Sequence, residues 1–484
     1  MALTKGRLSN PQYSKNIKRW EKMRDCFDGE ETVKEKSLSQ NIQHLDGGTD
    51  LRPIRTFDQY IRPTDMMRRL GKLGIQRFCD YIFRAKYYPF PIETQSQCLG
   101  LIENRPASFD LPAKMEGLLE DATTENESLE KVLSQINTHQ LQVSRVGLLL
   151  SPSNEENKPF NVALYTAESI VDWVEVTNAD SDLQLDWVKL KTDETEGDKP
   201  VFLILGMDGE RYFQFKTTNE AIDYQTDNAL ADGYIEDSFV YPMASERFIN
   251  EIPFVIINVT KLGVDIERPF LESIVDASLS LYRASAHHED ALYWGGESTL
   301  FTKMYGVGEN TQIFVGNGAI NKSNSPDADA KYVTMGIDGI EPRYQNVIRL
   351  FEYCVSLSVD LLNNGNESGK ALNIRSNVKT ASLKTLSLTG ALGLEFILRV
   401  GAKWIGLNPD DIKVKANTTF SDVQYTAEEF LKFASMVSLN TLSRNDLYVL
   451  LKKHNLTEVE TFDEWNLQFD LTNENSSEPE SNNP

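Results

Sequence analysis

Two patterns of apolar residues follow one another along this chain. Residues 143–260 alternate apolar and polar side chains as strands do, and long segments with the apolar spacing of helices follow them. Strands and helices that are separated in this way are typical of α+β proteins rather than of alternating βα units. We therefore expect an α+β fold.

The clearest strand signal is the segment VFLILGMDGERYFQFKTT at 201–218. Its two apolar and aromatic runs flank Asp208 and Gly209, a dipeptide typical of tight hairpin turns. Further strands are predicted at 146–150, 183–191 and 252–258. Residues 143–260 are thus expected to be mainly sheet, whereas residues 1–142 are expected to form a helical lobe.

Two helices are predicted at 268–294 and 342–362, and they bracket a glycine-rich, weakly β segment at 295–341. A third helical segment, 377–407, is strongly apolar. It contains Gly390, Gly393, Gly401 and Gly406, which invite bends.

The C-terminal part of the chain is more polar. Residues 408–470 contain a polar segment and a final helical pair, at 427–437 and 444–454. Residues 471–484 have the composition of a disordered tail.

The charge changes sign along the chain. Residues 1–90 contain 18 Lys and Arg against 11 Asp and Glu, the remainder contains 31 against 61, and the net charge is −23. An acidic body with a basic N-terminal segment is typical either of an ordinary solvated protein or of one whose N-terminal segment meets an acidic partner. Nothing in this balance predicts tight, general binding of nucleic acid.

Length and composition bound the class of protein. A chain of 484 residues usually divides into two to four lobes, unless it is stretched along a shared assembly. No run of eighteen apolar residues occurs, and the first residues lack the apolar core of a signal peptide, so we expect a soluble, cytoplasmic protein without membrane contact. The four cysteines, at 26, 79, 98 and 354, form no CxxC pair, and we expect buried free thiols.

The segment NNGNESGKALNIRS at 363–376 looks at first like a phosphate-binding loop. Such a loop needs glycine at its first position and a hydroxyl after the lysine, but Asn364 and Ala371 stand there. The chain also lacks a Gly-x-Ser-x-Gly elbow and an HExxH motif. These observations favour an assembly component over an enzyme, and we expect no catalytic residue, no metal and no cofactor.

One cluster of metal-binding residue types remains, His287-His288-Glu289-Asp290. Adjacent residues of a helix point about 100° apart, so a single ion does not collect them without ligands from elsewhere. We interpret the segment as a helical face exposed to a channel or to solvent. An enzyme with an unrecognised metal site here is the alternative hypothesis.

Several short motifs, taken in order, resemble those of the portal proteins of tailed bacteriophages, especially a family of about this length first catalogued as a domain of unknown function. The motifs are Arg24-Asp-Cys-Phe-Asp-Gly29, Tyr165-x-Ala-Glu168-x-Ile170-x-x-Trp173, Ile252-Pro-Phe254, Pro269-x-Leu-Glu-x-Ile-Val-Asp276, Leu281-Tyr282-Arg283-x-Ser285-Ala-x-His288 and Ser368-Gly369-x-Ala371-Leu372. Together they cover nearly the whole chain. The sequence departs from the family between Val33 and His44, where the usual apolar, proline-containing segment is missing.

The resemblance implies a twelve-subunit ring at one vertex of a capsid, through which double-stranded DNA is packaged and ejected. It implies the following parts: a wing at 1–265, stem helices at 268–294 and 342–362, a clip at 295–341, a tunnel loop region at 363–376, a long kinked helix at 377–407 and a helical crown at 408–470. The implied partners are non-specific DNA, the large terminase subunit, a head–tail adaptor, and the major capsid and scaffolding proteins. The implied location is the virion, with assembly in the host cytoplasm.

Within this picture two sets of residues are candidates for contact with DNA. The tunnel loop comprises Asn363, Asn364, Gly365, Asn366, Glu367, Ser368, Gly369 and Lys370, several of which tolerate turn conformations. Possible phosphate contacts are Lys370, Arg375, Lys379 and Lys384, although each also fits an ordinary surface cation. Another virion structural protein, such as a tail or baseplate component, is a further alternative.

Overall fold

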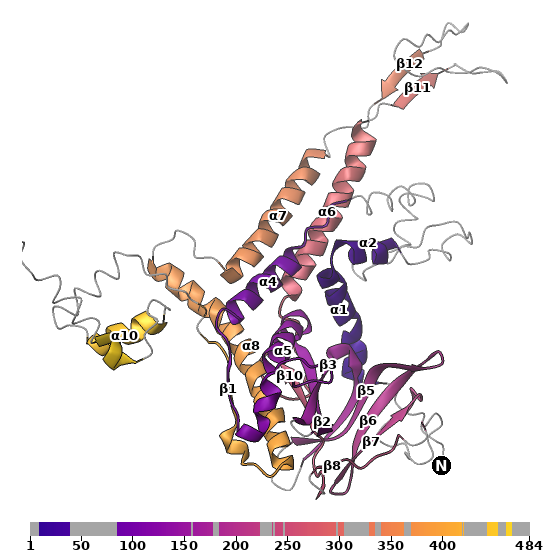
Figure 1. Ribbon diagram of the computed structural model, residues 1–484. Coiled ribbons are helices and arrows are strands. Elements are labelled where there is room, and N and C mark those ends of the chain that lie inside the picture. Colours follow the sequence, from indigo (N-terminus) through magenta and orange to yellow (C-terminus); the bar gives the residue numbers. More distant parts are fainter. Residues whose placement is uncertain are drawn as a thin grey trace, which may run out of the picture. The chain divides into compact units, whose positions relative to one another are not determined.

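The computed structural model describes residues 9–38, 85–155, 158–177, 183–222, 235, 238–244, 247–296, 299–303, 329–333, 340–362, 369–418, 420, 443–453 and 461–466. The chain divides into two compact units, Met1–Thr418 and Thr419–Pro484. The first unit combines helices with antiparallel sheets, which confirms the predicted α+β class (Figure 1). The boundary at 418 means that residues 408–418, which we expected in the crown, belong to the first unit.

Two antiparallel sheets form the centre of the first unit. The three-stranded sheet has the order β10-β2-β3, with β2 at Arg145–Glu155, β3 at Lys158–Thr166 and β10 at Phe254–Asn258. The four-stranded sheet has the order β4-β5-β6-β7, with strands at Ile170–Thr177, Leu183–Glu196, Lys199–Asp208 and Arg211–Thr217. A short turn of 3-10 helix, η2 at Ala167–Ser169, connects β3 to β4. The strands predicted at 143–260 are thereby confirmed.

The predicted hairpin is formed by β6 and β7. Gly209 in its turn has φ +63°, a left-handed conformation that glycine adopts without strain. Leu203 and Leu205 of β6 face the main core, whereas Phe202 and Ile204 belong to a second apolar cluster on the other side. This four-stranded sheet is therefore apolar on both faces. A small ribbon, β8 at Met243–Ala244 with β9 at Arg247–Phe248, follows it in the sequence.

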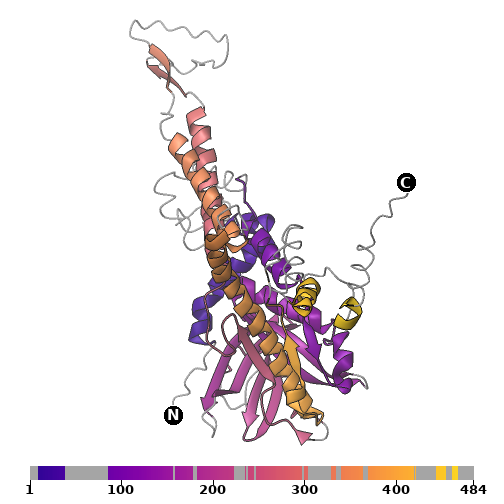
Figure 2. The same cartoon turned by 90° about the vertical axis from the view of Figure 1, so that its left-hand side faces the viewer.

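Helices α5, at Leu129–Val143, and α8, at Gly369–Trp404, pack against the three-stranded sheet and against each other (Figure 2). Ser128 caps α5 by accepting a hydrogen bond from Lys131 N. Helix α4, at Phe90–Ile102, leads to β1 at Ser108–Asp110 and to the 3-10 helix η1 at Ala113–Leu119. Strand β1 pairs with β13, at Lys413–Lys415, which follows the short η5 at Pro409–Asp411.

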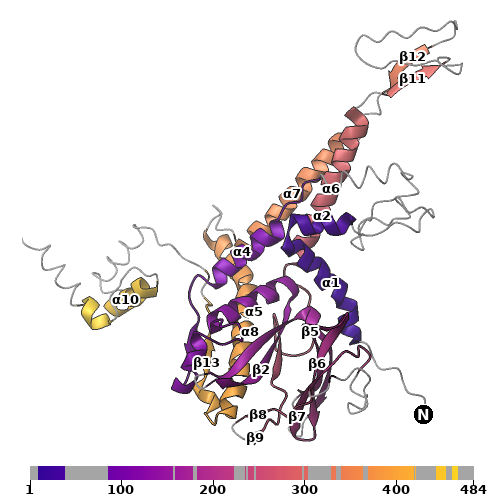
Figure 3. The same ribbon diagram turned by 45° about the vertical axis from the view of Figure 1, so that its right-hand side comes forward.

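The sequence predicts a bend at each glycine of this helical segment, whereas in the structure the glycines inside α8 allow close packing. Figures 1 and 3 show that α8 changes direction along its length, yet the helix is continuous through Gly390, Gly393 and Gly401. A Cβ at Gly401 would lie within 3.0 Å of three ring carbons of Phe160, and one at Gly393 would lie as close to Ile257. These glycines let the sheet side chains rest directly on the helix backbone.

Helices α6, at Glu272–Gly296, and α7, at Ile340–Leu362, pack side by side as an extended pair (Figure 1). Between them in the sequence lie β11, at Thr299–Lys303, and β12, at Asp329–Val333, which pair as an antiparallel ribbon. The helical segments predicted at 268–294 and 342–362 are confirmed, with ends that differ by four residues or fewer.

The N-terminal segment forms two helices, α1 at Pro11–Asp28 and α2 at Glu30–Leu38. Gly29 between them has φ +108°, which explains why the first helix ends there. Helix α1 lies beside α5, α6 and β4 (Figure 3). Residues 39–84 of the helical lobe expected at 1–142 lie outside the described residues.

In the second unit the described part includes α10 at Arg444–Lys453, which confirms the predicted last helix. Tyr448 of this helix packs on Phe462 and Trp465, with ring centroids 5.7 and 5.6 Å away. The helix expected at 427–437 and the tail at 471–484 lie outside the described residues.

Candidate assembly surfaces and DNA-contact residues

The predicted tunnel loop falls only partly within the described residues. Residues 363–368 lie outside them, whereas Gly369 and Lys370 form the first turn of α8. The expected loop region of 363–376 is therefore wrong after residue 368. The cause is local, because the residues KALN after Gly369 include three good helix formers and one glycine is tolerated at a helix start.

The four candidate phosphate contacts all lie on α8. Positions 370 and 384 lie on one side of a regular helix and positions 375 and 379 on the other, at about 100° per residue, so the four do not form one stripe. The side chain of Lys384 is exposed, and those of the other three are outside the described part. Lys384 is thus the one candidate whose access to a ligand the structure describes.

A row of exposed apolar side chains runs along α8. Leu388, Leu392 and Phe396, the α8 stripe, recur every four residues and are 38%, 53% and 44% exposed. The opposite side of the same helix is buried in the core through Leu394, Ile397 and other residues. A helix that is apolar on both sides normally has partners on both sides. The sequence showed that this segment is apolar but not which residues remain uncovered.

Part of the same helix, Ala381–Trp404, is long and apolar enough to cross a membrane by length and composition. Two thirds of its most apolar window is buried inside the protein, against strands and α5. Burial in the core accounts for most of this apolar character, and the α8 stripe accounts for the rest.

Helix α7 exposes aromatic rings as well. Tyr344 is 46% exposed and lies 5.4 Å from the ring of His288. Phe351 lies with its ring centroid 5.3 Å from that of Tyr88 and 5.4 Å from that of Phe90, at the start of α4. Tyr353, on another side of the helix, is 52% exposed. Exposed apolar side chains therefore lie on two helices, in the α8 stripe and at Tyr344, Phe351 and Tyr353 of α7.

The His287–Asp290 cluster does not gather into a site within the described residues. His287 is exposed, its carbonyl accepts a hydrogen bond from Arg343, and His288 faces Tyr344 of α7. No group of three or more His, Cys, Asp or Glu suited to a metal occurs in the part of the chain that the structure describes.

The basic N-terminal helix has acidic partners in its own chain. Arg19 Nε lies 2.9 Å from Glu272 of α6, Lys22 Nζ lies 2.7 Å from Asp276, and Arg24 Nε lies 2.9 Å from Glu168. Trp20 and Met23 of the same helix are buried. Helix α1 is thus held against the rest of the first unit by both ion pairs and buried apolar side chains.

Arg24 also sets the electrostatics around His139 of α5. Burial, together with the nearby charge of Arg24, lowers the pKa of His139 to about 4, against a smaller raising effect of Glu168. Burial raises the pKa of Glu168, but the charge and hydrogen bonds of Arg24 outweigh this effect, so the pKa of Glu168 is lowered. In the folded protein the charged Arg24–Glu168 pair therefore lies near a His139 side chain that is neutral at neutral pH.

Three of the cysteines are described, and all three are buried free thiols, as the sequence predicts. Burial raises the pKa of Cys26 and of Cys98 to about 12 and that of Cys354 to about 11. These buried thiols pack in the core, and their raised pKa values keep the reactive thiolate form rare at neutral pH.

No family model matches the sequence, and no curated protein matches it. Among solved structures, the chain is similar to one in the neck of an empty GTA particle computed with C6 symmetry, at 11% identity over 81% of this chain and 94% of that chain, with a TM-score of 0.40. It is also similar to a chain in the neck of a native GTA particle computed with C12 symmetry, at 12% identity over the same shares, with a TM-score of 0.35.

Proposed function

We propose that this chain is a portal-type protein of a tailed bacteriophage. Copies of it assemble into a ring. The proposed partners are those that the resemblance implies: double-stranded DNA, a terminase, a head–tail adaptor, and capsid and scaffolding proteins. In this proposal the protein is a structural component of the virion, located at one capsid vertex after assembly in the host cytoplasm, and it has no catalytic activity.

The observation that carries the proposal is the pair of separate apolar surfaces. A ring is built from head-to-tail contacts, in which one surface of each subunit meets a different surface of the next. The α8 stripe and the exposed rings of α7 are two such surfaces on one chain. A twofold dimer, in contrast, needs only one self-complementary patch.

The order of the elements supports the same proposal. The motifs that resemble portal proteins fall on β10, on α6 and at the start of α8, and a β-ribbon separates the two helices of the α6–α7 pair. This is the order of wing, stem, clip, stem and long helix that the resemblance implies.

Simple geometry is compatible with a channel for DNA. Twelve helices side by side at about 9–10 Å form a circle of roughly 18 Å radius, which leaves an opening about 26 Å wide after a helix half-width of about 5 Å is removed. Twelve chains of net charge −23 are strongly acidic. A duplex in such a channel is repelled rather than bound, because tight binding needs cations that release its counterions.

Ring formation through the α8 stripe is tested by Leu392→Glu, which places a carboxylate in the proposed contact. Burying that charge costs several kcal/mol, so we expect the ring to dissociate into smaller species. Leu119→Glu, at a leucine of η1 that is 37% exposed, is the matched control and should leave the assembly intact. Mass photometry of the two variants would show the difference, and intact rings of Leu392→Glu would contradict the proposed contact.

A further inference from the structure

The three described ion pairs that link helix α1 to other elements share one arrangement, with the cation on α1 and the acid on its neighbour. Arg19 and Lys22 pair with two acids of α6, and Arg24 pairs with Glu168 of η2. The hydroxyl of Tyr13 also donates to the carbonyl oxygen of Glu168 at 3.0 Å. The attachment of α1 therefore depends on acids that other cations do not claim.

His139 of α5 lies beside the last of these pairs. Arg24 of α1 and Glu168 of η2 are the two charged groups that act on its ring, and α1 packs against both α5 and η2 (Figure 3). Nδ1 of His139 is enclosed by protein and has no hydrogen-bond partner. Arg24 also donates from NH1 to Oε1 of Gln142, one turn further along α5. The imidazole and the ion pair thus share one interface between α1, α5 and η2.

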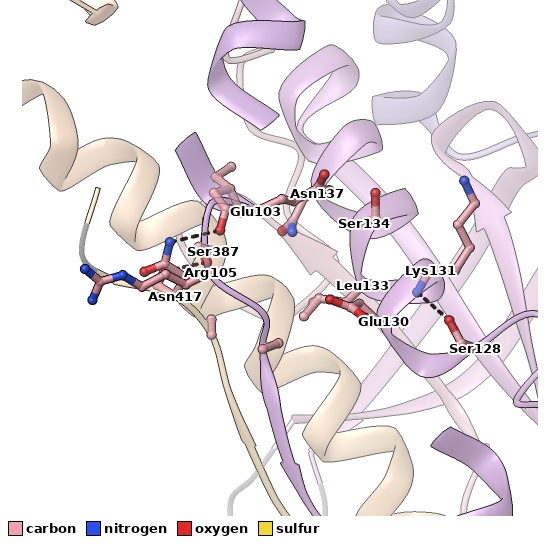
Figure 4. A pocket seen from close by; sticks show the side chains of 13 residues that line it. Glu103, Arg105, Ser128, Glu130, Lys131, Leu133, Ser134, Asn137, Ser387 and Asn417 are labelled. Carbon is pink, nitrogen blue, oxygen red and sulfur yellow. Dashed lines mark hydrogen bonds between the residues drawn. The ribbon is translucent and has the colours of Figure 1, made fainter. Parts of the chain in front are cut away.

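Other charged side chains around α5 face a different space. Glu103, Arg105, Glu130 and Lys131 line a pocket of about 410 Å³ together with Asn137 of α5 (Figure 4). His139 does not line it, because positions 137 and 139 point about 200° apart on a helix. Within the described residues, no charge from α4, α8, β2, β3 or η1, the other elements packed on α5, shifts the pKa of His139.

The charge of His139 decides which cation holds Glu168. Burial and the charge of Arg24 lower the pKa of His139 to about 4, so the ring is neutral at neutral pH and does not compete with Arg24 for the carboxylate. A protonated ring carries N–H donors at both nitrogens, repels Arg24 and attracts Glu168. Protonation therefore weakens the hold of Arg24 on η2.

We propose that α1 is an acid-sensitive arm: when His139 takes up a proton from solvent, Glu168 changes partner from Arg24 to the imidazolium, and α1 leaves α5 and η2 while the sheets stay folded. The released helix presents Arg19, Lys22 and Arg24 to solvent. This switch involves neither the α8 stripe nor the exposed rings of α7, so it stands apart from the proposed ring.

The packing of α1 allows it to leave alone. The two buried apolar clusters of the sheets contain no residue of α1, which meets them only through the half-buried ring of Tyr13. Residues 201–217 of the β6–β7 hairpin, in contrast, contribute to both clusters. Loss of α1 therefore leaves the apolar contacts of the hairpin in place, and the two segments can be followed separately.

The test is amide hydrogen exchange of the full chain, followed by mass spectrometry between pH 7 and pH 4 and corrected for the intrinsic exchange rates. The pKa of His139 is about 4 with α1 attached and about 6.5 for a free ring, so attachment is fully favoured above pH 6.5 and weakens as the pH falls toward 4. We expect the protection of residues 11–28 to fall by about a hundredfold over this range. Residues 201–217 should keep their protection.

Two variants separate His139 from the other contacts of α1. His139→Gln cannot acquire a charge, so the protection of residues 11–28 should change by less than about threefold between pH 7 and pH 4. Lys22→Gln removes an ion pair of α1 but keeps His139, so it should lower this protection at every pH and retain the acid response. The proposal is overturned by an acid response that persists in His139→Gln, by unchanged protection of residues 11–28 in the native chain at pH 4, or by an equal loss at residues 201–217.

Discussion

Gly401→Ala tests how α8 rests on the sheet. Alanine is favoured over glycine inside a helix by about 1 kcal/mol, so propensity alone predicts a more stable protein. At this position, however, the new Cβ would lie within 3.0 Å of three ring carbons of Phe160, with Cδ1 at 2.9 Å. Phe160 is fully buried and packs edge-on against Trp404, at 6.3 Å between ring centroids, so its ring has little space to move.

The expected size of the effect follows from these two opposing contributions. Overpacking a close contact costs about 1–3 kcal/mol, and the rigid ring places this site at the upper end. After the gain in helix propensity, we expect Gly401→Ala to lower the free energy of unfolding by about 2 kcal/mol. Urea unfolding followed by circular dichroism measures this change.

The matched control is Gly100→Ala in α4. No atom lies within 4 Å of the Cβ position at this exposed glycine, so only the helix propensity should act. We expect this variant to be as stable as the native protein or up to about 1 kcal/mol more stable. The reasoning would be refuted if both variants shifted stability in the same direction, or if Phe160→Leu failed to relieve the effect of Gly401→Ala in the double variant.

Three further predictions concern the acid response, the N-terminal helix and the proposed tunnel loop. The pKa of His139 is about 4 in the fold and about 6.5 when unfolded, so its contribution to stability is fully present above pH 6.5 and is lost as the pH falls toward 4, by at most about 3 kcal/mol. His139→Gln should flatten this part of a curve of stability against pH, and an unchanged slope would contradict the assignment. Arg24→Gln should lower the free energy of unfolding by about 2 kcal/mol, because it leaves Glu168 without its cation. The same variant should raise the pKa of His139. A stability equal to the native value would show that the Arg24–Glu168 pair contributes little. Deleting residues 363–368, which leaves α8 whole, should preserve assembly but block completion or retention of packaged DNA; heads filled normally by that variant would exclude the loop assignment.

The sheets and helices were predictable because their signals are local. The Asp208-Gly209 turn and the alternation in β6 specify a hairpin from a few neighbouring residues, and the spacing of α6 specifies its apolar face. The start of α8 was not predicted, because Gly369 was interpreted as a turn residue although helix formers follow it. The pairing of β1 with β13 was also missed, since these three-residue strands lie about 300 residues apart.

The candidate surfaces depend on contacts that the sequence does not encode locally. The sequence shows that Leu388, Leu392 and Phe396 are apolar, but only the packing of the opposite side of α8 shows that they remain exposed. Likewise, no local signal marks Arg145 as buried. Its guanidinium lies over Trp173, and burial lowers its pKa to about 9.

Copies of this chain are proposed to form a ring with an opening for DNA. Electron microscopy of the purified full chain, with class averages examined for rotational symmetry, tests this proposal. We expect twelvefold or closely similar rings whose central hole admits a duplex. A population made up only of compact monomers or twofold dimers would show that no such ring forms.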